Sequence, residues 1–305
     1  MERAVTGYRT FRAPVPGGEL AGGVWNTDAP AAGGSSGPTL VAIHGITASH
    51  RAWELVAAAL PDTRLIAPDL RGRGRSSGLP GPYRLVDHAD DVVRAMDALG
   101  VDRAPVVGHS MGAFVAVRVA ERHPDRVERL VLVDGGLPIP QPPGVAPEDL
   151  PSVVLGPALQ RLGMRFASPE EYRAFWHAHP AIGPWWNDAI ERYVDYDLVG
   201  EAPALRSSAA EAAVSVNALE LDGSAGYAEA LAGLTLPLAF LRAPRGLLDA
   251  DPLYDPSVVA DWARRLPAMR VHETDDLNHY TIVMTEDGVR QVLPLLHPTR
   301  TEETP

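Results

Sequence analysis

The chain has 305 residues, 46% hydrophobic and 22% charged, which suits one large globular domain or a core domain with a sizeable insertion. Its net charge of −12 argues against a nucleic-acid partner, and no apolar run approaches the roughly 20 residues of a membrane span. Cysteine is absent and all 27 basic residues are arginines, which excludes disulfides, thiol chemistry and mechanisms that need a lysine.

The beginning of the sequence and its motifs narrow the class further. Residues 1–7 lack the basic and then apolar pattern of a signal peptide, so we expect a cytoplasmic protein. The sequence also lacks HExxH, a tight cluster of His and Asp, and a G-x-G-x-x-G after a strand. We therefore expect no metal and no other cofactor, while oligomeric state is left open.

Eight short apolar or alternating runs predict strands, and helical periodicity separates most of them. The predicted strands are Tyr8 to Arg12, Leu20 to Trp25, Leu40 to Ile43, Arg64 to Ala67, Ala104 to Val107, Leu130 to Val133, Leu236 to Leu241 and Arg270 to Glu273. The predicted helices are Arg51 to Leu60, Val86 to Leu99, Ala113 to His123, Pro256 to Arg265 and Asp287 to Leu296. The pattern predicts an α/β fold: a mostly parallel sheet with helices on both faces and an antiparallel edge formed by the first two strands.

The alternation stops in residues 137–233, which predicts an inserted helical cap on a core domain of residues 1–136 and 234–305. The insertion opens with the proline-rich run 137–143, and eight of the chain's 19 aromatic residues fall between Phe166 and Tyr196. We expect at least half of these aromatics to hold the cap on the core and the others to line an apolar pocket. Trp176, Trp185 and Trp186 are the candidates for substrate contact.

Ser110 is the strongest functional candidate. It is the centre of a strand–turn–helix run, Val106-Val107-Gly108-His109-Ser110-Met111-Gly112, followed by an alanine- and valine-rich segment. Glycines two positions to either side are needed where a sharp turn leaves no room for side chains. This turn would place the hydroxyl at a helix N-terminus, where negative charge is favoured, whereas an ordinary tight turn is the alternative.

A serine nucleophile needs a base, and the base needs an acid to orient it. His279 follows the last predicted strand, on the same sheet edge as Ser110, and is the candidate base. The sequence offers two candidates for the acid. Asp134 follows the strand beside Ser110, and Asp249 follows the seventh strand after a long loop. We favour Asp134 and keep Asp249 as the alternative; Asp134 would otherwise cap the turn that opens the insertion.

Two backbone N–H groups should bind the oxyanion of an acyl-transfer reaction. The candidates are Met111, directly after the nucleophile, and Ile46, in the loop that follows the strand ending at Ile43. In that loop Gly45 lets the chain approach a substrate.

His50 and Tyr280 are further candidates for substrate contact, although His50 fits packing at the start of a helix equally well. Residues 69–76, rich in aspartate and arginine, predict a polar network that holds a loop near the site.

Taken together, these motifs resemble the α/β-hydrolase superfamily. The resemblance rests on His44-Gly45, Asp69-x-Arg71-Gly72-x-Gly74-x-Ser76, Gly108 to Gly112 and Asn278-His279, in that order and spacing. It implies an eight-stranded sheet, a cap between the sixth and seventh strands, and a serine nucleophile with a histidine and an acid. This chain departs from most members because the turn directly after its seventh strand, Arg242 to Arg245, has no carboxylate.

Asp134 instead matches the acid position after the sixth strand in some haloalkane dehalogenases and in a zearalenone-type lactonase. We therefore expect a cofactor-free serine hydrolase for a small-molecule ester or lactone with an apolar part. Carbon–carbon bond hydrolysis and perhydrolysis use the same triad and stay open as alternatives. A ligand-binding, receptor-like protein of the same fold is a third possibility.

Overall fold

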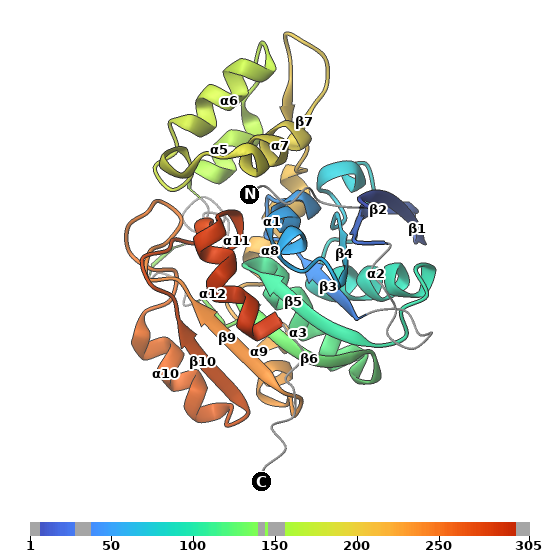
Figure 1. The fold of residues 1–305 in the computed structure, drawn as a ribbon, viewed down its shortest axis with the longest axis vertical. Helices are drawn as coiled ribbons and strands as arrows, with labels where there is room; N and C mark the ends of the chain where they lie inside the picture. Colours follow the sequence, from blue (N-terminus) through green and yellow to red (C-terminus); the bar gives the residue numbers. More distant parts are fainter. Residues whose placement is uncertain (1–6, 28–37, 140–143, 146–155, 297–305) are drawn as a thin grey trace.

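One mixed sheet of eight strands organises the molecule (Figure 1). The computed structural model describes residues 7–27, 38–139, 144–145 and 156–296. In the order in which they lie in the sheet, the strands are β1 (Arg9–Val15), β2 (Gly18–Trp25), β4 (Arg64–Pro68), β3 (Thr39–Ile43), β5 (Ala104–His109), β6 (Val127–Val133), β9 (Leu238–Arg242) and β10 (Met269–Glu273). All eight predicted strands are confirmed.

The sheet is antiparallel at one edge and parallel elsewhere. β1 pairs with β2, and β2 with β4, in antiparallel register, as the missing helix between the first two strands predicted. The pairs from β4 through β3, β5, β6 and β9 to β10 are parallel. Parallel pairing brings the carboxyl ends of these strands to one edge, and the loops that follow them carry the candidate site residues.

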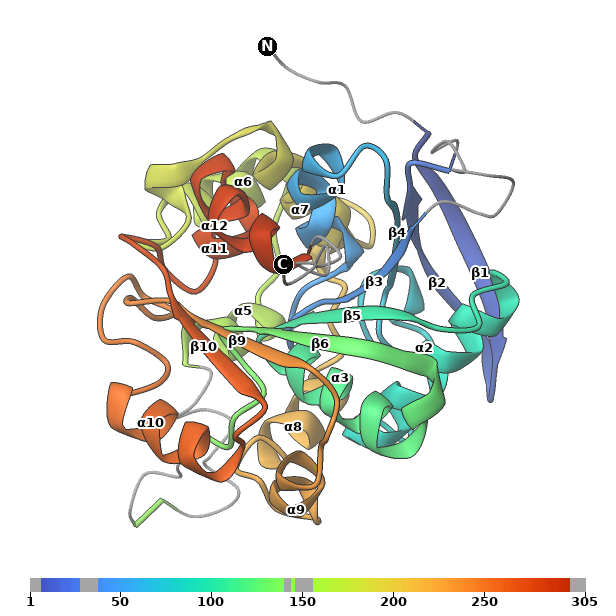
Figure 2. The ribbon, with the colours of Figure 1, turned by 60° about the horizontal axis from the view of Figure 1, so that its bottom comes forward.

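Helices cover both faces of the sheet, which explains why the central strands are apolar along nearly their whole length (Figure 2). One face carries α2 (Leu85–Ala98), α3 (Met111–Arg122), α8 (Glu211–Leu219), α9 (Tyr227–Ala232) and α10 (Pro256–Arg265). The other face carries α1 (Glu54–Ala59), α11 (Thr281–Met284) and α12 (Glu286–Leu296). None of the helices in the described part of the chain is long and apolar enough to cross a bilayer.

The chain between β6 and β9 builds a separate lobe and then returns to the core. The lobe contains α5 (Pro157–Gly163), α6 (Pro169–His177), α7 (Asp188–Asp197) and the short pair β7 (Leu198–Val199) and β8 (Arg206–Ser207) (Figure 1). α8 and α9 pack back on the sheet, where the Tyr227 hydroxyl donates to the Gly136 carbonyl at 2.6 Å. Residues 140–143 of the proline-rich run lie outside the described residues, and the cap boundaries stay a prediction.

The contact between β3 and α3 predicts a stability effect at Gly112. A Cβ on Gly112 would lie 2.1 Å from the Ile43 carbonyl oxygen, so Gly112→Ala should lower the free energy of unfolding by about 1–3 kcal/mol. Gly78 is the matched control, because it is exposed and a Cβ there meets nothing within 4 Å. Urea denaturation of the two variants measures the difference, and equal midpoints would contradict the close approach.

Candidate active site

Ser110 joins β5 to α3 with a backbone that few non-glycine residues adopt, φ 56° and ψ −128°. Glycines surround it because neighbouring backbone comes too close for a side chain. A Cβ on Gly108 would lie 2.3 Å from the Gly112 carbonyl oxygen, and one on Gly135 would lie 2.1 Å from the carbonyl oxygen of Ser110. The strained turn predicted around Ser110 is therefore present, and the strain is of the kind found at functional sites.

His279 and Asp134, separated by 145 positions, meet at the carboxyl edge of the sheet. His279 Nδ1 donates to Asp134 Oδ2 at 2.6 Å, and both side chains are buried. The other carboxylate oxygen of Asp134 accepts from the Ala243 N–H at 3.1 Å. These two bonds fix the carboxylate and leave His279 Nε2 as the imidazole nitrogen that is not held by Asp134.

His109 holds the loop that carries His279. Its Nε2 donates to the backbone carbonyl of His279 at 2.7 Å, and the two rings lie 4.7 Å apart. Burial lowers the pKa of His109 well below its ordinary value, and the nearby His279 lowers it further. His109 is therefore a neutral donor, and it fixes the main chain of His279 without bringing a second charge to the site.

Asp249, the alternative acid, contacts a neighbour of the imidazole instead. Its Oδ1 accepts from Asn278 Nδ2 at 2.8 Å and lies 2.9 Å from Arg245 Nε. The Asp249 side chain is 31% exposed, whereas that of Asp134 is fully buried. The structure thus pairs Asp134 with His279. Asp249 bonds to Asn278, the residue before His279 in the chain, and so supports the loop that carries the imidazole.

The loop after β3 approaches the serine closely. A Cβ on Gly45 would lie 3.2 Å from Ser110 Cβ, which is a tight contact, so this position has little room for a side chain. His44 holds the loop, because its Nδ1 donates to the Gly45 carbonyl at 2.8 Å and its Nε2 accepts from the Leu70 N–H at 2.9 Å. Burial lowers the pKa of His44 to about 4, which keeps the ring neutral.

Two backbone donors beside Ser110 have no protein acceptor. Among the described residues, no group accepts a hydrogen bond from the N–H of Ile46 or from the N–H of Met111. Ile46 lines the same cavity as Ser110, and Met111 is the first residue of α3. This arrangement is the one expected for donors that await a developing negative charge.

A cavity of about 150 Å³ opens onto the serine. It is lined by Gly45, Ile46, Thr47, Ala48, Ala52, His109, Ser110, Gly156, Ala158, His179, Tyr193, Leu247, Leu248, His279, Tyr280 and Met284. Gly45 and Tyr280 are there as expected. His179 and Tyr193 of the cap, and Leu247 and Leu248 after β9, were not chosen from the sequence. The two leucines lie in the loop that follows the parallel strand β9, and that position was a usable signal.

Four residues expected to touch a substrate do not line this cavity: His50, Trp176, Trp185 and Trp186. His50 is corrected to a buried structural residue, because its Nδ1 donates to Asp69 Oδ1 at 2.8 Å and its Nε2 accepts from the Tyr8 hydroxyl at 2.9 Å.

The three tryptophans belong to the cap's own packing rather than to the cavity. Arg161 lies 4.9 Å from the centre of the Trp176 ring, and Trp186 stacks on His177 at 3.8 Å. Trp185 ends the short helical turn Gly183–Trp185 between α6 and α7. Packing on Arg161 accounts for Trp176 and stacking on His177 for Trp186, whereas for Trp185 the structure shows only that it lies outside the cavity lining.

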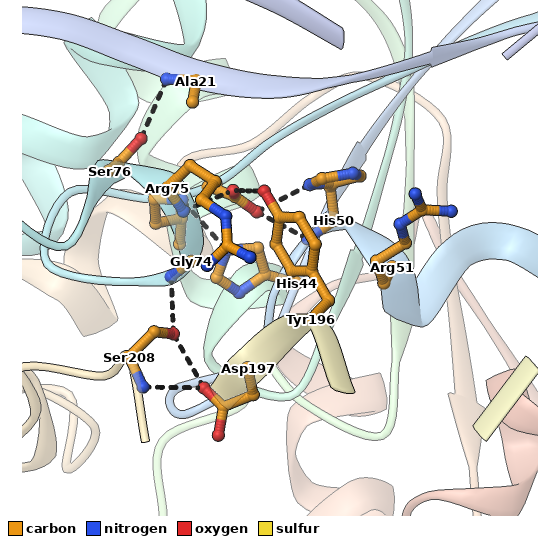
Figure 3. A network of polar contacts seen from close by, with 12 residues as sticks. Ala21, His44, His50, Arg51, Gly74, Arg75, Ser76, Tyr196, Asp197 and Ser208 are labelled. Carbon is orange, nitrogen blue, oxygen red and sulfur yellow. Dashed lines mark hydrogen bonds and ion pairs between the residues drawn. The ribbon is translucent and has the colours of Figure 1, made fainter. Parts of the chain in front are cut away.

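The loop of residues 69–76 contains the predicted polar network and joins the core to the cap (Figure 3). Asp69 Oδ2 accepts from the Tyr196 hydroxyl of α7 at 2.7 Å and from the Arg75 N–H at 2.9 Å. Burial alone would raise the pKa of Asp69, but the nearby His50 and His44, together with the hydrogen bonds from His50, hold it well below its usual range. The Gly74 N–H donates to Ser208 Oγ at 3.0 Å, which is a second tie to the insertion.

Among the described residues, no group of three or more His, Cys, Asp or Glu side chains is arranged to hold a metal ion. The site combines a serine, a histidine–carboxylate pair and backbone N–H groups without an acceptor among the described residues. Acyl-transfer reactions use groups of these kinds.

Comparison with known proteins supports the same conclusion about the fold. A family model described as the α/β-hydrolase fold matches residues 38–283. The solved structure of E-2-(acetamidomethylene)succinate hydrolase is similar over 95% of this chain and 99% of that chain, with a TM-score of 0.73 and 22% identity. At this identity the likeness concerns the fold alone.

Curated relatives match a shorter stretch. The chain is 40% identical over 102 residues to the lipase LipV of Mycobacterium tuberculosis, covering 33% of this chain and 39% of that protein. It is 39% identical over 99 residues to a putative carbamate hydrolase, RutD, of Caulobacter sp. strain K31, covering 32% and 37%. The matched stretch thus spans little more than a third of these relatives. Because the family model covers most of the chain and the sheet has the matching form, the protein belongs to the α/β-hydrolase fold family.

Proposed function

We propose that the protein is a serine hydrolase that cleaves a carboxylic ester or lactone with an apolar part, through an acyl-enzyme formed on Ser110. The observation that carries this proposal is the 2.6 Å hydrogen bond from His279 to Asp134, at the wall of a cavity that Ser110 also lines. A serine, a buried carboxylate and a histidine, in this order along the chain, form the triad arrangement of this fold.

In the acylation step, His279 Nε2 takes the proton of Ser110 as the serine oxygen attacks the substrate carbonyl. The carbonyl oxygen gains the negative charge, and the Ile46 and Met111 N–H groups donate to it. Asp134 keeps the proton on Nδ1 and stabilises the imidazolium that forms. His279 then protonates the leaving alkoxide, which leaves as an alcohol, or stays attached to the acyl group when the substrate is a lactone.

Deacylation repeats the same steps with water. His279 Nε2 takes a proton from a water molecule, whose oxygen attacks the acyl-enzyme carbonyl, and the proton then returns to Ser110 as the carboxylic acid leaves. The cycle balances without a metal or an organic cofactor, because only a proton and an acyl group are transferred. A cytoplasmic location and a small-molecule substrate complete the proposal.

The cavity argues for a compact substrate. Its volume of about 150 Å³ equals that of an engineered protein cavity that binds benzene. Most of the groups that line it away from the serine are apolar, with His179, Tyr193 and Tyr280 as polar exceptions. A short acyl chain or a small lactone ring fits this space, whereas a long chain needs room that the described cavity lacks.

Substrate size is therefore a first test. Among p-nitrophenyl esters, kcat/KM should be highest for acetate to butyrate and at least about tenfold lower for laurate, since a chain that does not fit loses about 1 kcal/mol or more of transition-state binding. Product analysis on the same esters, small lactones and diketones separates ester hydrolysis from carbon–carbon cleavage and perhydrolysis. A preference for laurate would contradict the size argument.

The nucleophile is tested by Ser110→Ala. Loss of the triad serine typically lowers kcat by about 10⁶-fold, so turnover of the best ester should become undetectable. A fluorophosphonate probe should label the wild type once, on Ser110, and should not label the variant; peptide mass spectrometry locates the adduct. Ser224→Ala, at an exposed serine before α9 and outside the cavity, serves as the control and should keep both labelling and turnover.

The two candidate acids are separated by a matched pair of amide variants. Asp134→Asn should lower kcat by about 10⁴-fold, because an amide at this place favours the wrong tautomer of His279. Asp249→Asn should keep most of the activity, since Asn278 and not the imidazole is its partner. Steady-state kinetics with circular dichroism to check folding decides the matter, and the reverse order of the two effects would exclude Asp134 as the acid.

A further inference from the structure

Arg73 is a buried arginine directly behind the two candidate oxyanion donors. Its side chain has no solvent exposure. The Nε group donates to the Ile46 carbonyl at 2.9 Å, Nη1 donates to the Arg71 carbonyl at 3.0 Å, and Nη2 lies 3.9 Å from Met111 Sδ. The guanidinium therefore contacts both Ile46 and Met111, the two residues whose N–H groups are the candidate oxyanion donors.

This cation has no carboxylate partner in the described part of the chain. The nearby acids are already engaged: Asp91 pairs with Arg71 at 2.8 Å, and Asp69 accepts from His50, Arg75 and Tyr196. Burying an arginine without a counter-charge is costly, and an apolar residue of similar size would fill the same space without that cost. A structural role alone therefore does not explain the charge.

The titratable groups around Arg73 leave its charge uncompensated. His44 comes from the end of β3, Tyr83 from the loop before α2, and His88 from α2. Burial lowers the pKa of His44 to about 4 and that of His88 to about 3, so both rings are neutral near pH 7. Burial also lowers the pKa of Arg73 to about 9, which still leaves the guanidinium protonated at neutral pH.

The position of the charge matters for an oxyanion. The hydrogen bond from Arg73 Nε keeps the Ile46 carbonyl from turning toward the cavity. In the cavity, the carbonyl oxygen would repel a negatively charged substrate oxygen. A positive charge in a water-free interior also attracts that oxygen much more strongly than it would in water. Both effects act when the tetrahedral intermediate forms, and only weakly on the neutral ester or lactone.

We propose that Arg73 is a positioning residue of the acyl-transfer site, which fixes the Ile46 carbonyl and supplies positive charge behind the oxyanion hole. This inference rests on the proposed serine-hydrolase function. It extends the site beyond the serine, histidine and acid to a buried cation in the loop of residues 69–76.

Three substitutions separate charge from hydrogen bonding. Arg73→Gln keeps an amide donor and loses the charge, Arg73→Met loses both, and Arg73→Lys keeps a charge without the planar fork. Arg75→Gln is the matched control, because Arg75 is an exposed arginine of the same loop whose side chain packs on Tyr196 outside the cavity. All four are assayed on the best p-nitrophenyl ester from pH 6 to 10, with thermal denaturation as the folding check.

We expect Arg73→Gln and Arg73→Met to lower kcat by roughly 10- to 100-fold with little change in KM, somewhat less than the loss of a direct oxyanion donor. Affinity for a boronic acid, whose serine adduct is a charged tetrahedron, should fall by a similar factor. The activity of Arg73→Lys relative to the wild type at the same pH should be highest near pH 6 and should fall as the pH rises, because lysine has a lower ordinary pKa than arginine and burial lowers it further.

Wild-type kcat in a folded Arg73→Gln variant, or an Arg73→Lys activity equal to that of the wild type at every pH, would overturn the role of Arg73. If the neutral variants do not fold, the Arg73→Lys pH profile decides alone. Ser110→Ala keeps the two proposals apart. Turnover that survives in Ser110→Ala overturns the serine mechanism and this inference with it, whereas an inactive Ser110→Ala beside fully active Arg73 variants overturns only the inference.

Discussion

The site depends on a backbone approach that leaves no room for a Cβ. Gly112 at the start of α3 lies against the end of β3, and Gly135 after β6 lies against the carbonyl of Ser110. Three chain segments thus meet around one serine: the loop with the free Ile46 donor, the nucleophile itself and the turn with Asp134. Because each close contact is backbone against backbone, no side-chain rearrangement can relieve it, and the geometry is rigid before any substrate arrives.

The register of the sheet explains why the sequence predicted that Asp134 lies beside Ser110. His109 of β5 pairs with Val133 of β6, so Ser110 and Asp134 are the next residues of two adjacent parallel strands. The strands themselves were evident from apolar runs, since a strand covered on both faces has no polar side. Asp249 lies farther from its strand in a longer loop, and nothing in its spacing said which neighbour it would bond. In the structure that neighbour is Asn278.

The break in the strand–helix alternation predicted an insertion after β6, but it did not predict which side chains of that insertion would line the cavity. Aromatic residues pack equally well in a core and in a pocket, so composition alone could not separate Tyr193, which lines the cavity, from Trp176, which does not. His50 misled for a related reason. It follows the oxyanion loop closely in sequence, but its ring nitrogens are taken by Asp69 and Tyr8, which come from distant segments. Such contacts arise only when the fold brings those segments together.

The loop of residues 69–76 links the insertion between β6 and β9 to the loop that carries Ile46. Toward the insertion, Asp69 accepts from the Tyr196 hydroxyl, and the Gly74 N–H donates to Ser208 Oγ (Figure 3). The Gly72 carbonyl also accepts from the Ala210 N–H. Two of these three ties use the backbone of the loop, and two use side chains of the insertion, those of Tyr196 and Ser208. Toward the serine, Arg73 reaches the Ile46 carbonyl. The side chains that shape the cavity from above, His179 and Tyr193, take no part in these ties. A change of specificity through the cap can therefore leave the oxyanion geometry intact, provided that the loop keeps both sets of bonds.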